Sequence, residues 1–206
     1  MRILSRRESS LESRDWKQAE YCVMDLETTG LNSTRDRIIS YGLVPVLEGR
    51  IRTAEAVYGV VNPGITITRE SVMVHALRQC DVAEAPDIDE CFDEILMRLE
   101  GRILVAHSAW IEVSFLAEAA KRRKTKLNLS VVDTAVLAGK ILTDSWLPSG
   151  HDIALEYASA VMGLPPHTPH HALGDAMTTA QVFLALGARL SADGLTAGDL
   201  IELSRR

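Results

Sequence analysis

The first strong hydrophobic run of the chain, Tyr-Cys-Val-Met-Asp-Leu, covers residues 21–26 and carries two acidic residues at its end, Asp25 and Glu27. Thr28-Thr29-Gly30 follows and ends the run. This order predicts a buried central strand that enters a loop. The stretch before it, residues 1–20, is polar and charged, and we interpret it as an N-terminal arm or short helix.

Four later segments also have the composition of strands. Residues 37–46 and 51–61 are separated by Glu48-Gly49, a pair typical of a tight hairpin turn. Residues 103–106 and 129–132 are shorter apolar runs. The pattern therefore predicts a mixed five-stranded sheet whose first three strands are antiparallel.

Helical periodicity is clearest in residues 87–99, where apolar side chains recur every three or four positions. Asp87 is placed to cap this helix, and Gly101 ends it. Further segments with the length and apolar rhythm of helices are 108–123, 134–142, 152–162 and 172–190. Strands come first and then alternate with helices, so we expect an α/β fold in which helices flank the sheet, with residues 21–206 as one domain.

Composition narrows the class of protein. The 206 residues are 47% hydrophobic and 24% charged, which predicts a soluble globular domain. No apolar run approaches the ~18 residues of a membrane span, so we expect a cytoplasmic protein without membrane contact. The three cysteines form no Cys-x-x-Cys pair, which argues against a disulfide framework or a zinc site. The net charge of −6 argues against a broad grip on duplexes, although residues 121–124 form a local basic cluster.

Asp25 and Glu27 carry the first chemical signal. Residues two apart on a strand point to the same face, so both carboxylates can converge on one point. Two adjacent anions require a cation, and carboxylate oxygens suit Mg²⁺ or Mn²⁺ better than Zn²⁺. Taken alone, the pair could also simply end a strand and cap a turn.

Two later segments present acids at comparable places. Glu112 lies near the start of the helix that follows the strand at 103–106, where the helix dipole alone would also favour an acid. Asp175 follows His170 by five residues, and His170 has a pKa suited to taking a proton from water. A histidine in a proline-rich loop is often only a surface residue.

The combination is more informative than its parts. Acids in three separated segments, with a histidine beside one of them, form the ligand set of a two-metal phosphodiester hydrolase. In such a site His170 would accept the proton of the attacking water. His151, His167 and His171 are rivals for this role, with His171 the closest, whereas His75 is too distant in sequence.

These residues resemble the motifs of the DnaQ-like, DEDDh class of 3′-to-5′ exonucleases, which includes the proofreading subunit of bacterial replicative polymerases. The first motif, Asp-x-Glu-Thr-Thr-Gly, is complete at 25–30, and the third, His-x-Ala-x-x-Asp-Ala, is complete at 170–176. The second motif, usually His-Asn-x-x-Phe-Asp, departs at 107–112, where Ser replaces Asn, Ile replaces Phe and Glu112 replaces Asp. The similarity runs from about Tyr21 to Leu190.

The resemblance implies an RNase H-like exonuclease fold for residues 21–206 and two bound Mg²⁺ or Mn²⁺ ions. Asp25, Glu27 and Asp175 would bind the first metal, Asp25 would bridge to the second, and Glu112 would support the second. The substrate-binding residues that the resemblance implies are Thr28, Thr29, Leu31, His107 and Ile111. The longer side chain of Glu112 predicts altered geometry at the second metal, with weaker metal affinity, a preference for Mn²⁺ or reduced activity as the open outcomes.

The expected activity is 3′-to-5′ hydrolysis of single-stranded or frayed DNA that releases nucleoside 5′-monophosphates. Two alternatives stay open: trimming of RNA 3′ ends, and binding of nucleic-acid ends or of a polymerase without cleavage. A contact with a DNA polymerase is a further expectation, with a free-standing or surface-bound enzyme favoured over a tightly integrated subunit. The sequence does not define an oligomeric state.

Overall fold

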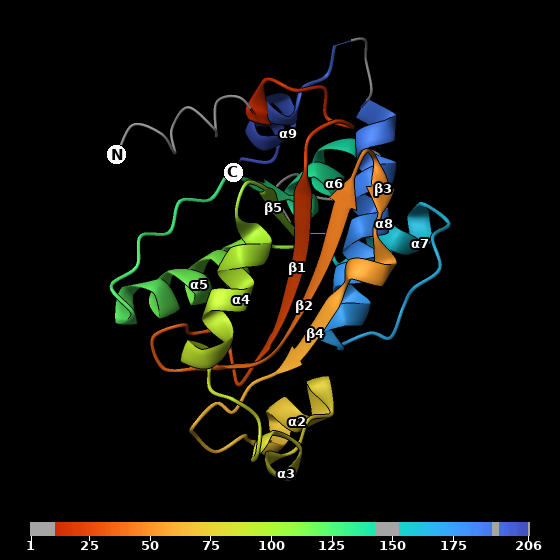
Figure 1. The fold of residues 1–206 in the computed structure, drawn as a ribbon. Helices are drawn as coiled ribbons and strands as arrows, with labels where there is room; N and C mark the ends of the chain where they lie inside the picture. The colour runs from red at the N-terminus through yellow and green to blue at the C-terminus, as the bar shows by residue number, and fades with distance from the viewer. Residues whose placement is uncertain (1–10, 143–152, 191–193, 206) are drawn as a thin grey trace.

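The protein is described from a computed structural model over residues 11–142, 153–190 and 194–205. Its centre is the strand β1 (Tyr21–Thr28), which pairs antiparallel with β2 (Ile38–Leu47) and parallel with β5 (Ile103–Ala106) (Figure 1). β6 (Val131–Asp133) pairs parallel with β5. The predicted α/β class with a mixed sheet is confirmed.

The strand count is a correction. The predicted strand at 51–61 is two strands, β3 (Arg50–Ile51) and β4 (Val57–Val60), separated by the 3-10 helix η1 (Thr53–Glu55), so the described sheet has six strands. Both strands pair with β2. Val46 of β2 pairs with Ile51 and Leu43 of β2 pairs with Val57, so a short step along β2 corresponds to a longer stretch of the segment that pairs with it. The surplus residues loop out as η1. A hairpin turn at Glu48-Gly49 is present, and both residues have positive φ angles (54° and 64°).

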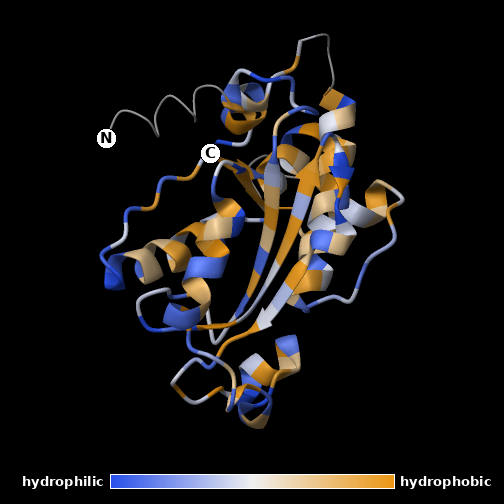
Figure 2. Ribbon diagram, in the orientation of Figure 1, coloured by the Kyte–Doolittle hydropathy of each residue, from blue (hydrophilic) through white to orange (hydrophobic). Residues whose placement is uncertain are grey.

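Helices cover both faces of the sheet (Figure 1). One face packs α8 (Ala172–Leu190) with α6 (Thr134–Leu142) and α7 (Leu155–Val161), and the other packs α4 (Ile88–Leu99) and α5 (Trp110–Arg122). These helices and the remaining strands match the predictions, with ends shifted by three residues at most. Figure 2 shows hydrophobic residues along the central strands and on the helices packed against them.

Side chains of β1 alternate between the two cores, as the two-residue period of a strand requires. Tyr21 and Val23 join the core under α8, whereas Cys22, Met24 and Leu26 join the core under α4 and α5. Continuing this alternation places the side chains of residues 25 and 27 on the α8 face. The α8 face of β1 therefore carries apolar core residues at its start and acidic residues at its end, while the other face of the strand is apolar up to Leu26.

Three short helices were missed by the sequence pattern: α2 (Arg69–His75), α3 (Gln79–Val82) and α9 (Ala197–Leu203). Their signal lies in caps rather than in apolar periodicity, since Thr68 accepts from the Ser71 N–H and Thr196 forms a capping box with Asp199. In the segment before β1, Trp16 is only 3% exposed and its carbonyl accepts from the Tyr21 hydroxyl at 2.7 Å. Within the described residues, no helix is long and apolar enough to cross a membrane.

Candidate active site

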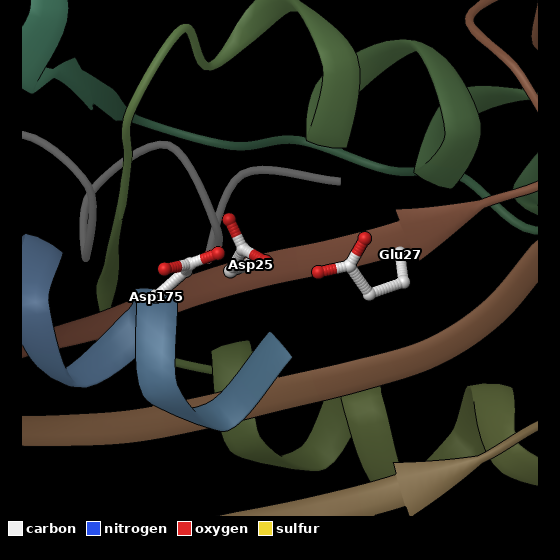
Figure 3. A group of neighbouring side chains, drawn as sticks. All are labelled: Asp25, Glu27 and Asp175. Atoms are coloured by element: carbon white, nitrogen blue, oxygen red, sulfur yellow. The ribbon is translucent and has the colours of Figure 1, made fainter. Parts of the chain in front are cut away.

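Three acidic side chains meet at the end of β1. Asp25 and Glu27 extend from the strand, Asp175 extends from the first turn of α8, and their carboxylate oxygens lie within 4.8 Å of one another (Figure 3). The structure thus brings together three of the four predicted metal ligands from segments far apart in sequence.

The close approach of α8 to β1 depends on Gly42. This residue pairs with Asp25 across the β1–β2 ladder, and a Cβ atom there would lie 2.3 Å from the Ala172 carbonyl oxygen. Gly174 has a similar role, since its Cβ would lie 2.2 Å from the carbonyl oxygen of Thr168. Neither glycine belongs to a turn signal that the sequence pattern could reveal, yet Gly42 allows the first turn of α8 to reach the sheet and Gly174 allows the loop at Thr168 to pack against that turn.

Glu112, the fourth predicted ligand, approaches from α5. β5 pairs with β1 only at Tyr21–Val23, so the end of β1 has no strand on this side. The Glu112 carboxylate accepts a hydrogen bond from the Leu26 N–H of this strand end. Glu112 is 2% exposed, and its Oε2 atom has no hydrogen-bond partner among the described residues. A buried carboxylate oxygen without a donor is suited to a cation.

The four acids oppose one another's ionisation. Burial raises the pKa of Asp25 well above its usual value, and the charges of Glu112, Glu27 and Asp175 raise it further. Burial and then the charge of Asp175 raise the pKa of Glu27 to about 7. Burial raises the pKa of Glu112 to about 8, with a further contribution from Asp133. Divalent cations would offset this repulsion, so the residues present fit a divalent metal site with oxygen ligands.

Asp133, at the end of β6, fixes the start of α5. Its carboxylate accepts backbone N–H groups of Ser108 at 3.0 Å, Ala109 at 3.1 Å and Ala135 at 3.0 Å. It therefore stabilises the first turns of α5 and α6 together, which positions Glu112. Sequence reasoning missed Asp133, although an acid directly after the apolar pair Val131-Val132 repeats the pattern seen at the end of β1.

The histidine of the second motif is held by the protein. His107 Nδ1 lies 2.9 Å from Thr134 Oγ1, and His107 Nε2 lies 2.6 Å from the Ile153 carbonyl oxygen. Next to it, Ser108 has a left-handed backbone with φ of 60°. In this structure His107 therefore ties the corner between β5 and α5 to α6 and to Ile153. Its predicted contact with substrate stays a prediction.

His170 lies at the edge of the acid group. Its backbone N–H donates to Asp175 Oδ2 at 2.8 Å, and its exposed side chain lies near enough for a positive charge on it to lower the pKa of Asp175. This effect and the hydrogen bond oppose the burial that raises the pKa of Asp175. The ring is therefore beside the proposed metal ligands and accessible to solvent.

The rival histidines differ in their surroundings. His171 stacks on Tyr58 with ring centroids 4.3 Å apart, and His167 Nε2 lies 3.1 Å from the Gln181 amide nitrogen. His151 lies outside the described residues. His75 is 6% exposed and contacts the Ser71 hydroxyl, which in turn donates to the Thr28 carbonyl at 3.3 Å. His75 therefore supports the end of β1 through Ser71.

The remaining predicted substrate residues surround the same strand end. The Thr28 hydroxyl donates to the Gly30 carbonyl at 2.7 Å, and the Thr29 hydroxyl accepts from the Arg37 N–H at 3.0 Å, which closes the loop after β1. Leu31 is 62% exposed, whereas Ile111 is half-buried beside the core under α4 and α5. Their roles in substrate binding stay predictions.

The chain matches a known protein family. Residues 22–183 match the RNase_T family, described as Exonuclease. The chain is 34% identical over 191 residues to a DNA polymerase III subunit epsilon-like protein of Rhodobacter capsulatus, covering 92% of this chain and 27% of that protein. It is 31% identical over 188 residues to a PolC-type DNA polymerase III of Thermotoga petrophila, covering 91% of this chain and 13% of that protein. The chain thus spans a minor part of both relatives.

Solved structures share the fold at lower identity. Exonuclease X in complex with 5′ overhanging duplex DNA has a TM-score of 0.69 and 22% identity, covering 90% of this chain and 99% of that one. The nuclease domain of 3′hExo, a DEDDh family member bound to rAMP, has a TM-score of 0.67 and 16% identity, covering 85% of this chain and 95% of that one. The solved structures thus share the fold, and the family match over residues 22–183 shows that the chain belongs to the exonuclease family.

Proposed function

We propose that the protein is a metal-dependent 3′-to-5′ exonuclease that hydrolyses single-stranded or frayed DNA and releases nucleoside 5′-monophosphates. The observation that carries the proposal is the meeting of Asp25, Glu27 and Asp175 within 4.8 Å at the end of β1. Beside them lie the buried Glu112 and the exposed His170. This arrangement supports the proposal, in which the acids would hold two divalent ions and His170 would act as the base.

Each residue has a distinct part in the proposed reaction. Asp25, Glu27 and Asp175 would hold one Mg²⁺ or Mn²⁺ ion, and Asp25 with Glu112 would hold the second. When bound, such ions lower the pKa of water and offset charge on the phosphate. His170 would accept the proton of the attacking water, and its position at the exposed edge of the acid group leaves room for that water. Thr28, Thr29 and Leu31 would hold the terminal nucleotide.

The deciding experiment follows a 5′-labelled single strand in Mg²⁺ and in Mn²⁺. The parent protein should shorten the strand one nucleotide at a time from the 3′ end. Asp25→Ala should lower the rate by roughly a thousandfold or more, because it removes a ligand common to both proposed ions. Equal rates for the parent and Asp25→Ala would contradict the proposal.

The base is tested separately with His170→Gln. We expect a loss of roughly a hundredfold or more in kcat, since removal of a general base typically has that effect. His171→Gln is the matched control, because His171 is the neighbouring histidine and stacks on Tyr58. A larger loss in the control than in His170→Gln would reassign the base.

Matched DNA and RNA strands of one sequence show whether the enzyme prefers deoxyribose or ribose substrates. The DNA preference is supported by the names of the relatives, which are DNA polymerase III subunits or polymerases. The experiment measures kcat/KM for both strands in the same metal. A higher kcat/KM for RNA would make the protein an RNA-trimming enzyme with the same site.

A further inference from the structure

An open groove lies between the loop after β1 and the outer surface of α5. Its volume is about 500 Å³, and its walls include Leu31, Asn32, Arg35, Trp110 and Ser114. Two large apolar side chains are exposed on opposite walls, Leu31 at 62% and Trp110 at 43%. A single exposed tryptophan needs no explanation, but an aromatic ring facing an exposed leucine across a groove indicates a binding surface.

Both walls of the groove come from segments that also carry an acid of the candidate site. Leu31 follows Glu27 by four residues, and Trp110 precedes Glu112 by two. Residues two apart on a helix point to nearly opposite sides, which agrees with the burial of Glu112 and the exposure of Trp110. Ser114, one turn after Trp110, continues the wall along α5. The groove therefore lies over the outer surface of α5, on two segments that carry Glu27 and Glu112 nearby in sequence.

The loop that forms the other wall is held in one shape by its own hydrogen bonds. The Asp36 carboxylate accepts the Asn32 N–H at 2.8 Å, and the Thr29 N–H donates to the Arg37 carbonyl at 2.9 Å. The Asp36 carboxylate is thus hydrogen-bonded to the backbone of its own loop. Arg35 is exposed and makes no ion pair with any residue in the described parts of the chain. Its guanidinium is available to an anion.

We propose that this groove binds the nucleotide that precedes the 3′-terminal one, with its base stacked on Trp110 and a backbone phosphate on Arg35. The proposal rests on the proposed nuclease function, which places the terminal nucleotide at the acid group beside Leu31. Aromatic stacking accepts every base, and one arginine supplies phosphate contact, so the groove favours single strands without sequence preference. The chain has 22 basic and 28 acidic residues, with a net charge of −6, so its affinity for a nucleic-acid strand must come from local contacts of this kind.

The experiment compares two substrates of the full chain. One is a six-nucleotide single strand, and the other is the 4-nitrophenyl ester of thymidine 5′-monophosphate, which has no preceding nucleotide. Trp110→Ala should raise KM for the strand roughly tenfold, because stacking on an aromatic ring typically contributes that much per base. The hydrolysis rate of the ester should stay unchanged. Trp110→Phe should retain most of the affinity for the strand.

Arg35→Ala and Met97→Ala complete the set. Arg35→Ala should weaken strand binding several-fold and make it less sensitive to salt, since one phosphate contact is lost. Met97 is 62% exposed on α4, and Met97→Ala should change neither substrate. Equal losses on the strand and the ester for Trp110→Ala would overturn the proposal, because they would show a general effect on α5. No loss on either would overturn it as well.

Failure of the nuclease function is detected separately. Dissociation constants for a labelled six-nucleotide strand are measured by anisotropy in EDTA, where no hydrolysis occurs. If the parent binds the strand and Trp110→Ala binds it roughly tenfold more weakly, the groove is supported even where the parent cleaves nothing. If the parent hydrolyses the strand and both proteins bind it equally, the groove proposal fails and the nuclease function stands.

Discussion

Two helix starts deliver one carboxylate each to the end of β1, and they do so in different surroundings. At the α5 corner, residues 107–112, the carboxylate of Glu112 is 2% exposed and has one oxygen without a partner. At the α8 corner, residues 170–175, Asp175 is half-buried and accepts the His170 N–H. In the proposed function, a cation would compensate the charge of the sealed corner. The open corner exposes His170, the proposed base, to solvent.

The support of the two corners differs as well. The α5 corner is held by hydrogen bonds, chiefly those from the backbone N–H groups of Ser108 and Ala109 to Asp133. The α8 corner is held by close contact, since Gly42 and Gly174 allow backbone to pack against backbone. A hydrogen-bonded corner tolerates small shifts of a side chain, whereas a corner built on missing Cβ atoms does not. Substitutions at the two corners should therefore fail in different ways.

Among the changes that test the contrast between the two corners, Gly42→Ala should have the largest effect. The added Cβ would lie 2.3 Å from the Ala172 carbonyl oxygen, so the first turn of α8 must move away from β1 and take Asp175 with it. We expect a loss of roughly a hundredfold or more in kcat, because a displacement of about 1 Å has that effect in preorganised sites. Strand degradation in Mn²⁺ measures it.

A glycine without such a contact provides the control for Gly42→Ala. A Cβ at Gly101 would meet nothing within 4 Å, although the φ of 73° makes any side chain there strained. Gly101→Ala should therefore lower the melting temperature while leaving the rate nearly unchanged. If Gly42→Ala retains the parent rate, α8 does not depend on close packing for the position of Asp175.

The next effect separates the two acids through Glu112→Gln and Asp175→Asn. Glu112→Gln removes a charge that burial disfavours, so the metal-free protein should become more stable, while metal binding and rate should fall roughly tenfold or more. Asp175→Asn should lower the rate as well but stabilise the metal-free protein less, because its carboxylate is half-buried and hydrogen-bonded. Melting in EDTA and titration with Mn²⁺ measure both. Equal stabilisation by the two variants would contradict the contrast between sealed and open corners.

A smaller effect is expected from pH on the metal-free protein. Glu27 and Glu112 have folded pKa values raised to about 7 and about 8, above their values in an unfolded chain. Between about pH 4.5 and pH 8 the folded state therefore holds more protons than the unfolded state, so these two groups favour folding at low pH and lose that contribution as pH rises. Melting in EDTA should show a decline over this window that Mn²⁺ reverses. A parent and Glu112→Gln with the same pH dependence would refute this account.

Sequence reasoning succeeded where a local pattern determines geometry. Asp25 and Glu27 lie two apart on a buried strand, so their shared face follows from the strand period alone. The helix that carries Asp175 was equally visible from its apolar periodicity, and its bounds match the structure. The sequence thus predicted the strand, the helix and the positions of these acids on them.

Sequence reasoning failed where tertiary contact decides. The break of the predicted strand 51–61 at η1 depends on the register with β2, which no local pattern shows. Gly42 and Asp133 act on residues far away in sequence, so their importance appears only in three dimensions. Glu112 was visible as an acid in a helix start, but its burial and its hydrogen bond from Leu26 were not.

The smallest effect concerns backbone strain, which both corners share. Ser108 and His170 have left-handed φ angles of 60° and 55°, and each precedes the helix that carries its acid. Asn and His adopt this conformation more readily than most residues, whereas Ser does so less readily. Ser108→Asn, which restores the usual residue of the second motif, should therefore stabilise the protein by roughly 0.5 kcal/mol and raise the melting temperature by about 1–2 °C. The rate should be unchanged, because Asp133 accepts the backbone N–H at this position and not the side chain. A lower melting temperature for Ser108→Asn would mean that the Ser108 side chain itself supports the α5 corner.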